Sequence, residues 1–244
     1  MKHFAAATLA FGIMMAAMPA ARAAETTCTT VITGTVNGNL IVPVGAQCSL
    51  NGTTVTGNVT VGKGAQLLVF AGTIYGNIQA HQCNSVFLTS FGTAISVGGN
   101  LQIQNCTGTG DNGYSTSGLS GTIEIDGNFQ CQNNTGPCLA QGGTVLNNVQ
   151  VIDNTGPAFI QGAMIHGNLQ VSGNNGGSTN PGAVVTGDTV MGNAQVNGNS
   201  GTDDVAVANN VIHGNLQCAS NTPGVIGGGS NTVGGHTQGQ CVIP

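Results

Sequence analysis

One seven-residue motif recurs along this chain and restricts what the chain can fold into. Residues 165–171 read Ile-His-Gly-Asn-Leu-Gln-Val, and residues 212–218 repeat this motif with a change only at the last position. Looser copies begin with a Gly-Asn pair or an Asn-Asn variant, and their first positions are Gly38, Gly57, Gly76, Gly99, Gly127, Asn147, Gly167, Gly192 and Gly214. A degenerate copy follows at Gly235. Such periodic copies indicate a solenoid.

Each copy contains short apolar segments that favour β-strands and are separated by Gly, Asn and Pro. Strands this short cannot bury a face within one copy. Each strand must therefore stack on its counterpart in the next copy, about 4.8 Å away. The sequence predicts an all-β fold, a parallel β-helix of about ten coils that forms one domain over residues 24–244.

The second residue of the repeated pair forms a column of asparagines. Asn tolerates the left-handed backbone conformation that a tight corner needs, and its amide can bond to the same amide in the next coil. These properties predict an internal asparagine ladder: Asn39, Asn58, Asn77, Asn100, Asn128, Asn148, Asn168, Asn193 and Asn215. With coils of about 22 residues, the architecture of residues 28–241 resembles the right-handed parallel β-helix proteins of the pectin-lyase-like group. The resemblance implies a single-stranded, right-handed β-helix.

The first coils are also similar to a second family. Residues 55–65 read Val-Thr-Gly-Asn-Val-Thr-Val-Gly-Lys-Gly-Ala, and the copies in this region are 19 residues apart. This stretch resembles the repeats of bactofilins, which are β-helical cytoskeletal proteins that form polymers. Bactofilins are cytosolic and nearly free of cysteine, so the eight cysteines and the export signal of this chain depart from their pattern.

The N-terminal segment is typical of a secretory signal peptide. Lys2 and His3 form a short basic region, residues 4–18 are apolar, and Ala21-Arg22-Ala23 is a small-x-small cleavage site. This pattern predicts a signal peptide over residues 1–23, and the segment resembles the signal peptides of Gram-negative bacteria. We expect a secreted, periplasmic or cell-surface protein. No later apolar run approaches the roughly 18 residues of a membrane span, so no transmembrane segment is expected in the mature chain.

Charge excludes several classes of partner. Only 5% of the residues are charged, against about a quarter in ordinary globular proteins. Without residues 1–23, Lys63 is the single Lys or Arg and faces eight Asp and Glu residues, which gives a net charge of −7. A nucleic-acid partner would need several basic side chains to neutralise phosphates, and an anionic polysaccharide or membrane would be repelled.

The eight cysteines predict disulfide bonds, because an even number of cysteines in an exported chain is typical of disulfide-bonded proteins. Cys83 and Cys106 lie at the same position in adjacent copies, which places their Cα atoms within disulfide reach. We therefore predict a Cys83–Cys106 bond. Nearest-neighbour pairing is favoured for the others, although eight cysteines allow 105 connectivities: Cys28, Cys48, Cys131, Cys138, Cys218 and Cys241.

The sequence contains no recognisable catalytic constellation. Polysaccharide lyases of the pectin-lyase-like group use calcium-binding carboxylates with an Arg or Lys base, and Lys63 stands alone in the mature chain. We predict no enzymatic activity, no cofactor and no metal, with loop-bound calcium near Asp203 and Asp204 as an alternative. His166 and His213 share a column, but Met191 separates them, so they would lie too far apart to share a metal.

The remaining regular feature is a column of glutamines that should face solvent: Gln79, Gln102, Gln130, Gln150, Gln170, Gln195, Gln217 and Gln238. We expect either a structural amide ladder or a surface that contacts a glycan or another rod. The sequence favours an exported, non-enzymatic structural, adhesive or matrix protein that self-associates or binds a cell-surface component. The alternative is a protein that binds or cleaves a neutral glycan through loops near residues 107–120 and 197–204, with Tyr114, Asp203 and Asp204 as contacts.

Overall fold

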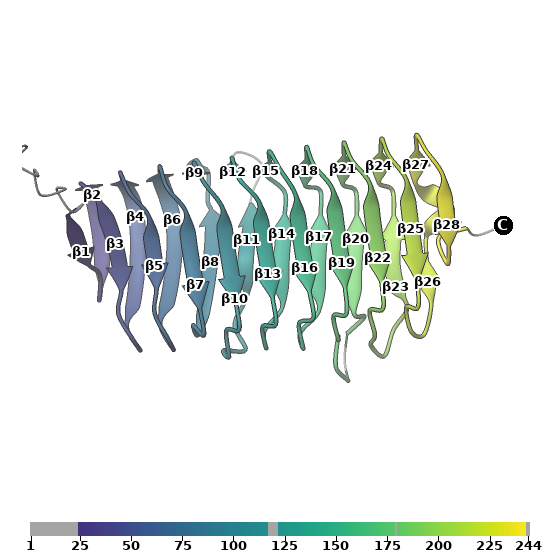
Figure 1. The fold of residues 1–244 in the computed structure, drawn as a ribbon, viewed down its shortest axis with the longest axis horizontal. Helices are drawn as coiled ribbons and strands as arrows, with labels where there is room; N and C mark the ends of the chain where they lie inside the picture. The colour runs from purple at the N-terminus through teal and green to yellow at the C-terminus, as the bar shows by residue number, and fades with distance from the viewer. Residues whose placement is uncertain (1–23, 117–121, 179, 243–244) are drawn as a thin grey trace, which may run out of the picture.

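The chain folds into an elongated stack of β-strands. The computed structural model describes residues 24–116, 122–178 and 180–242, and the predicted signal peptide lies outside them. The strands run across the long axis, and successive coils follow one another from the N-terminal to the C-terminal end (Figure 1). Neighbouring strands are parallel and come from consecutive coils. The prediction of an all-β parallel solenoid is confirmed.

The strands after the Gly-Asn pairs form the first sheet, sheet A. It has eleven strands in one row, and like members of successive copies are exact register partners, as in the pairing of Gln150 with Gln170. The strands of sheet A are β1 (Glu25–Thr27), β3 (Asn39–Val42), β5 (Val59–Val61), β7 (Ile78–His81), β10 (Leu101–Gln104), β13 (Phe129–Gln132), β16 (Val149–Ile152), β19 (Leu169–Ser172), β22 (Ala194–Asn197), β25 (Leu216–Ala219) and β28 (Thr237–Gly239).

The other strands form sheet B, which bends into two rows. The main row is β2 (Val31–Val36), β4 (Gln47–Val55), β6 (Gln66–Ile74), β8 (Ser85–Ser90), β11 (Asn112–Thr116), β14 (Cys138–Gln141), β17 (Ala158–Gln161), β20 (Ala183–Thr186), β23 (Val205–Ala208) and β26 (Val225–Ile226). The short row is β9 (Ile95–Val97), β12 (Ile123–Ile125), β15 (Thr144–Val145), β18 (Met164–Ile165), β21 (Thr189–Val190), β24 (Val211–Ile212) and β27 (Thr232–Val233). A 3₁₀ turn, η1, spans Gly228–Ser230.

The two rows of sheet B begin as one strand and then separate. The first part of β6 pairs with β8, and its last part pairs with β9. From this point each coil has three short sides instead of two long ones. Alternate side chains of every side point inward, so Val149 and Val151 of β16 are fully buried while Gln150 between them is not. The core is therefore a narrow column of aliphatic side chains.

The Gly-Asn pairs form the corner before sheet A, and their amides bond from coil to coil as predicted. Asn77 donates to Asn58 Oδ1 from both its backbone N–H (2.8 Å) and its Nδ2 (3.0 Å). The predicted internal asparagine ladder is present, but other residues form it at the next corner, and two details predicted for this column are wrong. This column is exposed or half-buried rather than internal, and of its glycines and asparagines only Gly38 has a positive φ. Glycine is favoured at the first position because a Cβ on Gly167 would lie 2.6 Å from Asn148 Oδ1, although one coil accommodates Asn147 there.

Most of the left-handed residues other than glycine lie at the second corner, between sheet A and the main row. They include Asn105, Asn133 and Asp153, with φ values of 57°, 55° and 54°. The residue after each of them turns inward. From the middle of the chain onward that residue is a fully buried asparagine, which forms an internal ladder: Asn134, Asn154, Asn174, Asn199 and Asn221.

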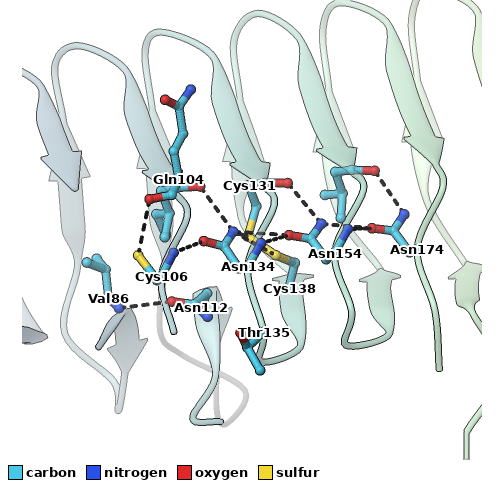
Figure 2. The surroundings of a disulfide bond; sticks show 12 residues. Val86, Gln104, Cys106, Asn112, Cys131, Asn134, Thr135, Cys138, Asn154 and Asn174 are labelled. Carbon is cyan, nitrogen blue, oxygen red and sulfur yellow. Dashed lines mark hydrogen bonds between the residues drawn. A yellow bond between two sulfur atoms is a disulfide. The ribbon is translucent and has the colours of Figure 1, made fainter. Parts of the chain in front are cut away.

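This internal ladder is continuous from coil to coil (Figure 2). Asn134 donates to Asn154 Oδ1 from its backbone N–H (2.8 Å) and from Nδ2 (3.1 Å). Asn154 in turn donates from Nδ2 to Asn174 Oδ1 (2.7 Å) and to the Cys131 carbonyl (3.1 Å). The amides of this ladder are thus satisfied by their neighbours, which is what burial of a polar group demands.

All four disulfides join nearest neighbours, as the register favoured. The Cys83–Cys106 bond joins adjacent coils with a Cα–Cα distance of 4.4 Å, and Cys28–Cys48 and Cys218–Cys241 do the same near the two ends. Cys131–Cys138 closes a seven-residue separation within one coil, beside Asn134 (Figure 2). Among the described residues, no helix has the length and apolar character to cross a membrane.

Candidate interaction faces

The outer face of sheet A carries the predicted glutamine column, and we call it the amide face. The register places these glutamines directly opposite one another from β7 to β28. Gln102 Nε2 donates to Gln130 Oε1 and Gln130 Nε2 donates to Gln150 Oε1, each over 2.9 Å. Each member is exposed or half-buried. The predicted column and its outward direction are therefore confirmed.

A shallow groove runs along the amide face, between the glutamines and the Gly-Asn corner. One stretch of about 330 Å³ is bounded by Asn148, Gln150, Asn168, Gln170, Asn193 and Gln195. The next stretch, of about 310 Å³, shares Asn193 and Gln195 and continues to Gln238. The groove is therefore lined by amides that follow the long axis of the solenoid, each able to donate and accept a hydrogen bond.

The main row of sheet B carries a different surface, which the sequence analysis did not identify. From β6 to β26, one position in each strand forms a register column of apolar side chains interrupted by one glycine, and we call it the apolar stripe: Leu68, Phe87, Gly113, Leu139, Phe159, Val184, Ala206 and Ile226. Phe159 and Val184 are half-buried, and Ile226 is 51% exposed. The repeat alignment centred on the Gly-Asn pair did not reach this column, because insertions of different length precede it.

Tyr114 is not a surface residue, so its predicted role as a glycan contact is wrong for this structure. Residues 112–116 form β11 rather than a loop, and the register aligns Tyr114 with the inward-facing Leu88 and Ala140. Its ring is fully buried and packs edge-on against Phe129, with centroids 5.4 Å apart. Its hydroxyl has no hydrogen-bond partner, and burial raises its pKa. Residues 117–120 of the predicted loop lie outside the described residues.

The other predicted contacts do not assemble into a site with Tyr114. Asp203 is exposed and Asp204 is half-buried, and both lie in the turn before β23. Three strands of the main row lie between β23 and β11, the strand that contains Tyr114. His166 and His213 are both exposed. Within the described ranges, no three His, Cys, Asp or Glu side chains are grouped to hold a metal ion.

One buried carboxyl escaped the sequence analysis. Asp188 is 1% exposed and lies at the third corner, between the main row and the short row, in a column with Asn210 and Asn231. Its Oδ1 accepts a hydrogen bond from the Ala163 N–H (2.8 Å), as Asn210 Oδ1 does from the Asp188 N–H (2.9 Å). Asp188 thus occupies an asparagine position in a second internal ladder.

The second oxygen of Asp188 is where its chemistry differs from asparagine. Asn210 Nδ2 donates to the Val185 carbonyl, and Asn231 Nδ2 donates to the Val207 carbonyl. In the register of the strands, Asp188 Oδ2 occupies the position that Nδ2 has in these asparagines, and the corresponding carbonyl is that of Ile160. Asp188 Oδ2 has no hydrogen-bond partner. Burial raises the pKa of Asp188 to about 7, although backbone N–H groups of Ala163 and Thr186 act in the other direction. Tyr114 is the titratable group that interacts with it.

The strand order and the corner ladders define the class of protein, a parallel β-solenoid with stacked asparagines. Comparison of the chain with protein-family models, with curated proteins and with solved structures finds no match. The two outer faces therefore provide the argument about function.

Proposed function

We propose that the chain is an exported, non-enzymatic structural protein that acts by self-association or by contact with a cell-surface or matrix component. The observation that carries this proposal is the uniformity of the two faces. The eight amide-face strands from β7 to β28 and the eight main-row strands from β6 to β26 contain no Lys, Arg, Asp or Glu. Long, uncharged and regular faces suit repeated contacts with another extended surface.

Export is supported by two independent features. The N-terminal sequence has the three regions of a signal peptide, and the chain forms four disulfides, which persist in oxidising compartments. This combination supports a secreted, periplasmic or cell-surface location. Mass spectrometry of the protein from culture fractions tests it, because the mature chain is expected to begin after Ala23 and to contain no free thiols.

Sedimentation velocity and electron microscopy of residues 24–244 test the structural role. We expect association that rises with protein concentration, and rods that lie side by side or on a cell surface. A chain that stays monomeric at the highest attainable concentration and binds no cells would contradict the proposal.

The groove on the amide face favours a second candidate, which is binding of a neutral glycan. Its walls offer amides in successive coils, about 4.8 Å apart along the axis, and amides can hydrogen-bond to sugar hydroxyls without any charge. Titration calorimetry with uncharged oligosaccharides tests this candidate. Gln170→Ala should weaken binding, whereas the matched loop variant Asp203→Ala should not.

A further inference from the structure

We infer that the apolar stripe is the surface on which a second copy of this chain docks, so that two solenoids pack face to face through the main rows of sheet B. The inference rests on the proposed self-association and assigns it to one face. The alternatives would be the amide face or the open ends of the stack.

The first argument is the composition of the main row. In β17, β20 and β23 the inward residues are buried aliphatics, and the outward residues of the stripe are Phe159, Val184 and Ala206. Flanking outward positions are uncharged, as with Gln161 and Thr186. A strand that is apolar on both faces is typical of a sheet covered on both sides. Here the core covers one side, and the described part of the chain leaves the stripe half-exposed or exposed except at Gly113 and Leu139, which are buried.

The second argument is the match of the stripe to itself. Each member is the register partner of the next, so the side chains repeat at the strand spacing of about 4.8 Å. A surface with the same spacing can interdigitate with it, as paired sheets do in dry interfaces. A second copy supplies that spacing without any further adaptation, and a two-fold axis makes both partners use the same residues.

The third argument is area. Eight strands at about 4.8 Å spacing, each about four residues wide at 3.3 Å per residue, give a face of roughly 500 Å². Two such faces bury about 1,000 Å² in total, which reaches the lower limit for a specific interface. Phe70 and Phe91 lie beside the N-terminal part of the row with ring centroids 6.5 Å apart, and Phe91 is 65% exposed. They extend the apolar surface at that end.

Sedimentation equilibrium of the mature, disulfide-bonded chain tests the inference with two stripe variants and a matched control. Phe159→Lys and Val184→Lys each place a charge in the stripe, and Gln170→Lys places the same charge on the amide face. We expect the stripe variants to raise the dimer dissociation constant about 100-fold or more, and the control to leave it unchanged. Circular dichroism melting identifies any variant that misfolds. If Phe159→Lys misfolds, Val184→Lys provides the test instead.

A mixing experiment tests the two-fold geometry. Phe159 lies near the middle of the stripe, so in a two-fold pair it meets its own counterpart or a close neighbour. Phe159→Lys and Phe159→Glu should each be monomeric alone and should form a mixed dimer when combined. Failure of the mixture to associate would overturn the face-to-face arrangement.

The outcomes separate this inference from the proposed function. If the wild type associates and Gln170→Lys alone disrupts it, the stripe is not the docking surface and the structural role stands. If the wild type does not associate at any concentration, the inference fails, and the proposed function then depends on cell binding alone.

Discussion

In the N-terminal coils, the inward position of the second corner is filled by Ala65, Cys83 and Cys106, whereas in the C-terminal coils the same column holds Asn134 and its successors. Ala65 is simply small, and the two cysteines bond to each other. The asparagines instead satisfy one another across every coil boundary. The comparison shows that the same inward position can join neighbouring coils in two ways. A disulfide joins two coils locally, whereas a continuous ladder of amides joins many coils collectively.

The two solutions respond differently to damage. A disulfide stabilises the two coils that it joins and leaves the others unchanged. An asparagine in the ladder provides the acceptor for one neighbour and the donor for another, so its removal leaves polar groups unsatisfied on both sides. We expect the coils that contain the asparagine ladder to be more sensitive to a single side-chain substitution at this corner, and the coils joined by Cys83–Cys106 to be more sensitive to reduction of that bond.

The largest effect is expected from Asn154→Ala in the internal ladder. The Asn134 N–H and Nδ2 lose their acceptor and the Cys131 carbonyl loses its donor. At about 1–3 kcal/mol for each buried unsatisfied group, the free energy of unfolding should fall by about 4 kcal/mol. Urea titration measures the loss. A loss below about 1 kcal/mol would show that the ladder does not act collectively.

The next effect comes from the disulfides. Replacing Cys83 and Cys106 by serine opens a loop of 23 residues and should lower the free energy of unfolding by about 3 kcal/mol. Replacing Cys131 and Cys138 by serine opens a loop of only seven residues and should lower it by about 2 kcal/mol. Hydrogen exchange locates the change. Increased exchange is expected in β6 to β10 for the first pair, and an equal increase over all coils would contradict the local character of the bond.

Asp188→Asn tests whether the third corner works as an amide ladder. The folded pKa of about 7 lies above the ordinary value of 3.8, so the folded chain holds the proton more tightly. The stabilisation is full below pH 4 and is lost as the pH rises toward 7. At about 1.4 kcal/mol per pH unit, the wild type should lose about 2 kcal/mol between pH 5 and 7.

The asparagine variant should remove this slope, because its amide can donate where the carboxylate cannot. Unfolding free energies of the two proteins, measured by urea titration across this pH range, provide the check. Parallel pH profiles for the wild type and Asp188→Asn would assign the slope to other groups.

The smallest effect is expected from Asn168→Ala at the Gly-Asn corner. Asn168 makes the same kinds of bond as Asn154, to Asn148 and Asn193, but it is exposed, so water can replace its amide. A loss of about 1 kcal/mol is expected. This variant is the matched control for Asn154→Ala, and equal losses in the two would show that burial does not distinguish the ladders.

The sequence predicted the register because the Gly-Asn pair recurs with little variation, and a parallel stack places equal positions on top of one another. The Cys83–Cys106 bond and the outward glutamines followed from the same alignment. The internal ladder did not, because its column changes from Cys106 to Asn134 and therefore does not look like a repeat. A signal was present, since Asn134 and Asn154 each lie six residues after a corner asparagine.

The candidate faces were harder to predict than the fold. Tyr114 lies in a Gly-rich stretch with loop composition, and only its pairing with β8 and β14 turns it inward. Asp188 was not singled out because its column also contains the small residue Ala163 and therefore does not form a polar repeat in the sequence. The apolar stripe crosses positions whose spacing from the Gly-Asn pair changes from coil to coil, so it becomes visible only after the strands are aligned in space.

The direction of the amide ladders has an electrostatic consequence. At the Gly-Asn corner each Nδ2 donates toward the preceding coil, as Asn168 does to Asn148, whereas in the internal ladder each Nδ2 donates toward the following coil, as Asn154 does to Asn174. Their bond dipoles therefore oppose each other along the axis. Wherever a coil extends both of these asparagine ladders, it adds opposing contributions, so the two ladders together do not accumulate an axial field as the stack lengthens.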